Sequence, residues 1–286
     1  MPDVAVWPAC DAACVFCSNP GGPFRRPLAE HALPELVRRL GLYRAGLASF
    51  AKFDAARDAV TLTGGEPTLH PRFLALLGAV RRLFPYALIR LLTHGRRFAD
   101  AGFASRVLAA AGAPFEAAVN LAGPEHGLER ALRGTANLLA LSRPGQTVGL
   151  RTVLTAPVLG RLEGLAALAV RRLKGLTGWA LLFPEFEGRA LSSPDVVGLR
   201  MVKTAGLLAG LRPRLERAAP LSLYHLPLCV LAPSERALAR STLDPAKVVF
   251  GRQCRSCALR PDCVGIHKSY ACAVGVGEFV ATPAIL

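Results

Sequence analysis

The chain alternates between short apolar runs and longer segments whose apolar residues recur at helical spacing. A short apolar run bounded by turn residues is typical of a buried strand, and apolar residues at i, i+3 and i+4 indicate a helix with one buried face. The apolar runs predict six strands, over Val4–Trp7, Ala59–Leu62, Ala87–Leu92, Phe115–Asn120, Val148–Leu154 and Trp179–Phe183. Helices are predicted over Leu28–Ala51, Pro71–Phe84, Phe98–Ala111, Leu128–Leu141, Leu159–Leu173 and, after the sixth strand, Val196–Leu215.

Strands that alternate with helices predict an α/β fold with a parallel sheet. The pattern changes after Arg217–Pro220, because the remaining residues show few regular periods and contain five of the eight cysteines. A segment of about seventy residues buries little core of its own and is often held together by metal. We therefore expect two domains: a core over residues 1–215 and a small, irregular, cysteine-rich extension over residues 216–286.

The composition excludes several classes of protein. Hydrophobic residues make up 52% of the 286 residues, so the chain is not disordered. No apolar run approaches the roughly 20 residues of a membrane span, and no signal peptide is recognisable. Cysteines in such a chain point to metal binding in a reducing compartment rather than to disulfides. We expect a cytoplasmic protein that does not bind membranes.

The net charge of +15 comes almost wholly from arginine, often in pairs along the predicted helices. Such a charge can attract nucleic acid or an acidic peptide. The sequence contains no aromatic stacking platform and no recognisable RNA-binding module. We therefore do not expect nucleic acid to be the partner.

Three cysteines follow the first predicted strand as Cys10-x3-Cys14-x2-Cys17, with Phe16 directly before the third. Three thiolates can hold three irons of a [4Fe–4S] cluster, which leaves the fourth iron open to a small molecule. A structural zinc site is the alternative, but it needs a fourth ligand and no histidine lies near these cysteines in the sequence.

This spacing, together with Thr63-Gly64-Gly65-Glu66-Pro67 after the second strand, resembles the radical S-adenosylmethionine (SAM) enzymes. The resemblance implies a partial (β/α)6 TIM-like barrel and a cluster that binds SAM at its open iron. Reductive cleavage of SAM would then give a 5′-deoxyadenosyl radical that abstracts hydrogen from a substrate. Both motifs follow strands, which is the end of a barrel where chemistry takes place.

The same resemblance implies further SAM contacts. Gly64 and Gly65 would allow the backbone to approach SAM closely, and the Glu66 carboxylate would offset its ammonium group. Thr93-His94-Gly95 stands where the family often has Thr-Asn-Gly. The SAM-binding positions implied in this way are Phe16, Gly64, Gly65, Glu66, Pro67, Thr93, His94, Asn120 and Arg151. Strand-end solvation or core packing is the alternative for the last four.

The segment Glu185-x-x-Gly188-x-Ala190 follows the sixth strand. A similar segment occurs in radical SAM enzymes that carry an auxiliary cluster. The resemblance places Glu185 and Glu187 on the substrate side, and an ordinary polar loop is the alternative.

The extension contains Cys254-x2-Cys257-x5-Cys263, with Cys229 upstream. The arrangement resembles the twitch or SPASM-type extensions of radical SAM enzymes, which implies one auxiliary [4Fe–4S] cluster on these four cysteines. A zinc site with four cysteines is the alternative. Cys272 is then left over. We expect His267 to be a solvated loop residue, and a ligand role is its alternative.

The resulting hypothesis is a radical SAM enzyme, an oxidoreductase-type maturase of ribosomally synthesised peptides. The auxiliary cluster would accept the electron released when a crosslink or an oxidation is completed. Partners would include a reductant such as flavodoxin or ferredoxin. Because the core pattern begins at residue 4, we expect a leader peptide to be recognised either by a separate leader-peptide-binding protein or by the basic helices. Alternatives are a radical SAM enzyme acting on a small metabolite or RNA, and a non-catalytic Fe–S carrier.

Overall fold

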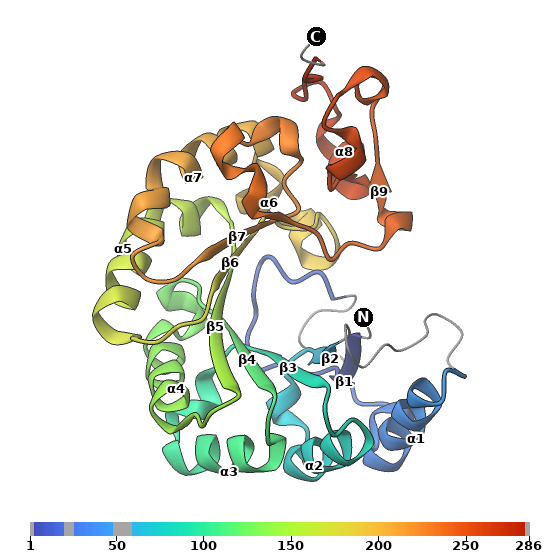
Figure 1. The fold of residues 1–286 in the computed structure, drawn as a ribbon, viewed down its shortest axis with the longest axis vertical. Coiled ribbons are helices and arrows are strands. Elements are labelled where there is room, and N and C mark those ends of the chain that lie inside the picture. The colour runs from blue at the N-terminus through green and yellow to red at the C-terminus, as the bar shows by residue number, and fades with distance from the viewer. Residues whose placement is uncertain (1–2, 20–25, 48–58, 284–286) are drawn as a thin grey trace. The chain divides into compact units, whose positions relative to one another are not determined.

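The computed structural model describes residues 3–19, 26–47 and 59–283, and Figure 1 traces its helices and strands. Contacts within the chain define two compact units. The first consists of Met1–Ala13, Gly21–Leu150 and Arg171–Thr177, and the second of Cys14–Pro20, Arg151–Val170 and Gly178–Leu286.

The first unit is built from parallel strands joined by helices. Its strands are β1 (Asp3–Trp7), β2 (Ala59–Gly64), β3 (Leu88–Thr93), β4 (Phe115–Asn120) and most of β5 (Gln146–Val153). Its helices are α1 (Leu33–Arg44), α2 (Phe73–Leu83), α3 (Ala101–Ala111) and α4 (Leu128–Leu141). Strands β1 to β4 pair in parallel and in chain order. In Figure 1, α1 to α4 lie on the same side of these strands.

The hydrophobic pattern explains this arrangement. Strand β3 buries every second residue, so that Ile89 and Leu91 are fully enclosed. Helix α2 buries Leu76, Leu77 and Val80 at the spacing of one helical face. Helix α3 begins where the Asp100 carboxylate accepts a hydrogen bond from the backbone N–H of Phe103 at 3.1 Å.

The second unit contains the remaining elements. They are α5 (Ala156–Arg172, the last two residues of which belong to the first unit), β6 (Trp179–Leu182), α6 (Pro194–Val197), α7 (Met201–Leu215), β7 (Leu221–Tyr224), β8 (Ala239–Arg240), β9 (Val248–Val249), β10 (Ile266–His267) and α8 (Lys268–Val274). Strands β6, β7 and β8 pair in parallel, whereas β9 and β10 form a separate antiparallel pair. The buried Trp179 donates its indole N–H to the Thr152 hydroxyl at 2.9 Å.

The strand order within the main sheet is β1-β2-β3-β4-β5-β6-β7-β8, so neighbours in the sheet are also neighbours in the sequence. This order is typical of a TIM-like barrel, and in the described residues β1 and β8 are the two ends of the order. The predicted fold class is confirmed. In the described part of the chain, the sheet includes two short strands, β7 and β8, beyond the six expected from the sequence.

The observed helices are shorter or shifted relative to the prediction. The helix expected over Leu28–Ala51 is α1, Leu33–Arg44, and the end of the predicted range, from residue 48, lies outside the described residues. The helix expected over Val196–Leu215 is divided into α6 and α7. The expected domain boundary between residues 215 and 216 stays a prediction. Within the described residues, no helix is both long and apolar enough to cross a membrane.

Candidate active site

The Gly64-Gly65-Glu66 turn holds the backbone that leads into the first cysteine motif. The backbone N–H of Gly65 donates to the carbonyl of Trp7 at 2.7 Å, and that of Glu66 donates to the carbonyl of Ala9 at 3.0 Å. A Cβ on Gly65 would lie 2.4 Å from the Ala9 carbonyl oxygen. Gly64 has φ of +133°, which L side chains rarely adopt. Both glycines are therefore required by the close approach to residues 7–9, and their approach to SAM stays a prediction.

The Glu66 side chain lies beneath this turn and is almost fully buried, with 1% of its surface exposed. One carboxylate oxygen accepts from the Thr68 N–H at 3.1 Å, the Thr68 hydroxyl at 2.6 Å and the Thr93 hydroxyl at 2.8 Å. The other accepts from the backbone N–H of His94 at 2.9 Å. Glu66 thus ties the end of β2 to the end of β3, and the protein itself satisfies its charge.

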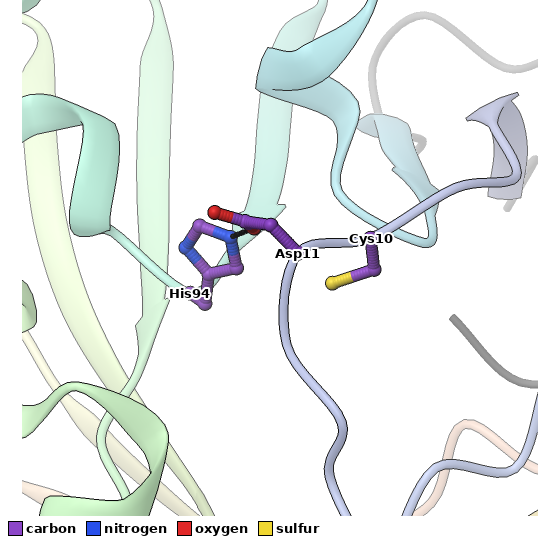
Figure 2. Close-up of side chains that lie close together, drawn as sticks. All are labelled: Cys10, Asp11 and His94. Atoms are coloured by element: carbon purple, nitrogen blue, oxygen red, sulfur yellow. Dashed lines mark hydrogen bonds and ion pairs between the residues drawn. The ribbon is translucent and has the colours of Figure 1, made fainter. Parts of the chain in front are cut away.

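The cysteine motif is also attached to β3 through its own aspartate. Figure 2 shows the Asp11 carboxylate against the His94 ring, with Cys10 beside it on the same loop. Asp11 Oδ1 lies 2.7 Å from His94 Nε2 and 2.7 Å from Arg96 Nη2. Although burial acts to raise the pKa of Asp11, the charges and hydrogen bonds of His94 and Arg96 lower it.

The position of His94 bears on the zinc alternative for this loop. The sequence places no histidine near Cys10, but folding brings donor atoms of Cys10, Asp11 and His94 within 4.8 Å of one another. His94 Nδ1 accepts from the backbone N–H of Arg96 at 3.1 Å, which leaves the proton on Nε2. A zinc ligand needs a lone pair at Nε2, and Arg96 adds a positive charge at Asp11. The contacts of His94 therefore do not favour zinc.

The three motif thiols are partly exposed and free of disulfides. Burial raises the pKa of the Cys10 thiol to about 11, with Glu66 and Asp11 adding to the effect. The backbone N–H of Cys17 lies 3.3 Å from the carbonyl of Cys14. Because metal binding stabilises the thiolate, a bound cation would reverse the effect of burial at Cys10.

The remaining predicted SAM contacts lie near strand ends. Thr93 is buried against Glu66, and Pro67 is the first residue of a short 3-10 helix that follows the turn. Asn120 is the last residue of β4 and is partly exposed. Arg151 lies on β5, and Phe16 lies in the cysteine motif.

The loop after β6 contacts the other end of the cysteine motif. The backbone N–H of Arg189 donates to the carbonyl of Cys17 at 3.0 Å. Gly188 has φ of +56°, and a Cβ there would lie 2.8 Å from the same carbonyl oxygen. The preceding residues, Glu185 and Glu187, contact Lys247 and His267.

Four cysteines of the C-terminal segment line one pocket: Cys229, Cys254, Cys257 and Cys263. Burial raises the pKa of Cys229 to about 11, and the charges of the other three thiolates add to this effect. Four thiols that interact in this way match the donor set of a [4Fe–4S] cluster or of a zinc ion. Cys272 is exposed and does not line the pocket.

His267 differs from the expectation for a solvated loop residue, since only 3% of its surface is exposed. Its Nδ1 accepts from the backbone N–H of Ser269 at the start of α8. The pairing of β10 with β9 buries it, and a two-residue strand gives no periodic signal in the sequence.

Comparison with solved structures places the fold among known proteins. In the crystal structure of Streptococcus suis SuiB bound to S-adenosylmethionine, the aligned chain has a TM-score of 0.62 at 12% sequence identity, covering 98% of this chain and 75% of SuiB. The chain shares its fold with SuiB. For the structure of SuiB bound to the precursor peptide SuiA, the TM-score is 0.57 at 12% identity, covering 78% of this chain and 49% of SuiB.

The likeness to SuiB confirms the predicted resemblance to radical SAM enzymes at the level of the fold. This chain thus spans about half the length of SuiB in the peptide-bound structure. No family model matches the sequence, and no curated protein matches it.

Sequence reasoning did not find three charged residues of these sites. Asp11 and Arg96 hold the cysteine motif to the end of β3, and Lys247 contacts the loop after β6. Asp11 lies inside the motif, so its position was a signal that could have been used. Arg96 and Lys247 give no such signal, because arginines and lysines are common on surfaces.

Proposed function

We propose that this protein is a radical SAM enzyme. The observation that carries the proposal is the attachment of the start of the three-cysteine motif, around Cys10, to the carboxyl ends of β2 and β3, in a fold shared with SAM-bound SuiB. The carboxyl ends of parallel strands are where TIM-like folds place their chemistry.

The chain's own residues have distinct roles in this proposal. Cys10, Cys14 and Cys17 hold three irons of a [4Fe–4S] cluster. When bound, the cluster supplies the electron that cleaves SAM to a 5′-deoxyadenosyl radical. Glu66 and Asp11 hold the motif in place, as their hydrogen bonds indicate.

SAM is proposed to contact the turn and the neighbouring strand ends. Backbone groups of Gly64 and Gly65 face the start of the motif, and Pro67, Thr93 and His94 flank Glu66. Further proposed contacts are made by Glu66, toward the ammonium group of SAM, and by Phe16, Asn120 and Arg151.

We further propose that Cys229, Cys254, Cys257 and Cys263 hold one auxiliary [4Fe–4S] cluster, with zinc as the alternative occupant. The donor set supports a closed site, because all four thiols line one pocket. A closed cluster suits electron transfer, so this site is proposed to accept the electron released when the product forms. Glu185 and Glu187 are proposed to lie on the substrate side.

The proposed substrate is a ribosomally synthesised peptide, which would be crosslinked or oxidised. The support comes from the fold shared with SuiB, one of whose structures contains the precursor peptide SuiA. A flavodoxin or ferredoxin would supply electrons, and a separate protein would bind the leader peptide. An enzyme acting on a metabolite or RNA and a non-catalytic carrier are the alternatives.

Metal analysis tests the two sites separately. Anaerobically reconstituted wild-type protein should contain about eight irons and no zinc, because two cubes hold four irons each. Cys14→Ala and Cys257→Ala should each lose about four irons, and Cys272→Ala, the matched control, should lose none. About four irons with one zinc would make the C-terminal site structural. Full iron content in Cys14→Ala would contradict the first site.

A further inference from the structure

The loop after β6 carries a charged group that the proposed SAM chemistry does not use. Glu185 and Glu187 lie on this loop, His267 ends β10, and all three belong to the second compact unit. One donor atom from each residue lies within 4.8 Å of the other two. The two carboxylates are 25% and 32% exposed, so solvent reaches the group from the side of the loop.

One ring nitrogen of His267 points toward the two carboxylates and has no hydrogen-bond partner. Its side chain is 3% exposed, and Nε2 is buried without a hydrogen-bond partner. The opposite nitrogen, Nδ1, is in close contact with the Ser269 hydroxyl. That hydroxyl also accepts from the backbone N–H of Phe186 at 3.1 Å. In the tautomer that carries its proton on Nδ1, the ring donates to the Ser269 hydroxyl instead of accepting from the Ser269 N–H, and Nε2 then holds a lone pair. A metal ion bound at Nε2 selects this tautomer.

The distances around Nε2 fit a shared ion better than a direct hydrogen bond. Nε2 lies 3.5 Å from Glu185 Oε2 and 3.3 Å from Glu187 Oε1. Both separations are long for a charge-assisted hydrogen bond. Two ligands of one divalent ion, each bound at about 2.0–2.2 Å, lie roughly 3.0–3.4 Å apart. The separation from Glu187 falls within this range, and that from Glu185 lies just above it.

The charge balance also favours a cation. Lys247 Nζ lies 2.7 Å from Glu187 Oε2 and 3.5 Å from Glu185 Oε2, so it contacts the Glu187 oxygen that does not face His267. Two carboxylates against one ammonium leave a net negative charge inside a strongly basic chain.

We propose that Glu185, Glu187 and His267 form a binding site for a divalent first-row metal ion, made of nitrogen and oxygen donors and separate from the cysteine sites. Ser269 fixes the histidine ring from behind, as outer groups commonly do at metal sites. The Lys247 ammonium group neutralises part of the charge of the two carboxylates and therefore lowers the affinity of the site for a cation.

Manganese(II) is the probe of choice. Carboxylate ligands suit it, whereas thiolates select softer metals, so the cysteines do not compete. We would titrate Mn²⁺ into anaerobically reconstituted protein without SAM and follow the free ion by electron paramagnetic resonance. Wild-type protein should remove one equivalent from solution. Glu187→Gln should weaken binding at least about tenfold, and Lys247→Met should strengthen it about tenfold.

Glu163→Gln is the matched control, because it removes an exposed carboxylate that pairs with Arg214 at 2.8 Å elsewhere in the same unit. It should bind Mn²⁺ as the wild type does. Thermal unfolding of each variant verifies that it is folded. A wild-type protein that leaves the free signal unchanged, or a folded Glu187→Gln variant that binds equally well, would overturn the proposal. Neither result depends on whether the protein cleaves SAM.

Discussion

At the scale of single residues, two carboxylates near the first cysteine motif are held by hydrogen bonds and ion pairs from neighbouring residues. Glu66 accepts hydrogen bonds from Thr68, Thr93 and His94, and Asp11 is held by His94 and Arg96. These contacts restrain the loop around Cys10 against the ends of β2 and β3.

The contacts of Asp11 lead to a prediction for the reactivity of Cys10. Asp11→Asn removes a charge that raises the pKa of Cys10 and weakens the contacts with His94 and Arg96. Alkylation of Cys10 in the iron-free protein should then be faster, because both thiolate population and access increase. Mass spectrometry of the labelled peptide measures the rate. The partly buried Asp195→Asn, in the second compact unit, is the control and should have no effect. An unchanged rate in Asp11→Asn would show that the contacts do not restrain the loop.

A second residue-scale prediction concerns pH. His225 is buried, and burial lowers its pKa to about 4, compared with about 6.5 in an unfolded chain. Between these values the unfolded chain binds the proton and the folded chain does not. The contribution of His225 to the free energy of unfolding is therefore complete above pH 6.5. It decreases by about 2–3 kcal/mol as the pH falls toward 4.

Urea unfolding at a series of pH values measures this loss. In His225→Gln the slope between pH 6.5 and 4 should become smaller, because no group there takes up the proton. The ring nitrogens of His225 contact the Phe183 carbonyl at 3.3 Å and the Thr242 hydroxyl at 3.2 Å, and glutamine can contact both. An equally steep slope in the variant would assign the pH dependence to other groups.

At the scale of elements, the turn after β2 packs closely against the backbone that follows β1. A Cβ at Gly65 would lie 2.4 Å from the Ala9 carbonyl oxygen and 2.5 Å from that of Pro8, and neither backbone atom can move aside easily. Gly65→Ala should therefore destabilise the protein by about 2 kcal/mol or more and reduce iron uptake by the first site.

The matched control for Gly65→Ala is Gly164→Ala in α5, where a Cβ would meet nothing within 4 Å. Alanine should stabilise that helix by about 0.5–1 kcal/mol. Urea midpoints of the two variants should move in opposite directions. Equal stability of Gly65→Ala and the wild type would mean that the turn does not hold the loop tightly.

The same elements show what could be predicted from the sequence. Apolar runs and helical periods located six strands and most helices, because each buries a regular face. Strand β7 is as long as β6, but it begins directly after Pro220, where the sequence predicts the change to an irregular segment. The two residues of β8 give almost no periodic signal. The motifs located the cysteines and Glu66, but the structure shows that the glycines serve the approach of two backbone segments. Contacts such as Asp11–His94 join residues 83 positions apart and depend on the fold.

At the scale of the whole molecule, the sequential strand order and the likeness to SuiB both indicate a TIM-like α/β fold. The sheet runs from β1 to β8 in chain order, and SAM-bound SuiB aligns over 98% of this chain. The four cysteines Cys229, Cys254, Cys257 and Cys263 lie in the second compact unit, which also contains the loop that contacts Cys17. This loop contacts Cys17 through Arg189, and it contacts Lys247 and His267 of the C-terminal segment through Glu185 and Glu187. Substitutions in the loop can therefore be used to measure whether the C-terminal segment changes iron binding by the first motif.

The most direct test of the central claim is the formation of 5′-deoxyadenosine. Iron-loaded wild-type protein, given SAM and dithionite under anaerobic conditions, should release it. Cys14→Ala should release none, because one of three cluster ligands is missing, whereas Cys272→Ala should match the wild type. Release of equal amounts by Cys14→Ala, or none by fully loaded wild-type protein, would contradict the assignment of radical SAM chemistry.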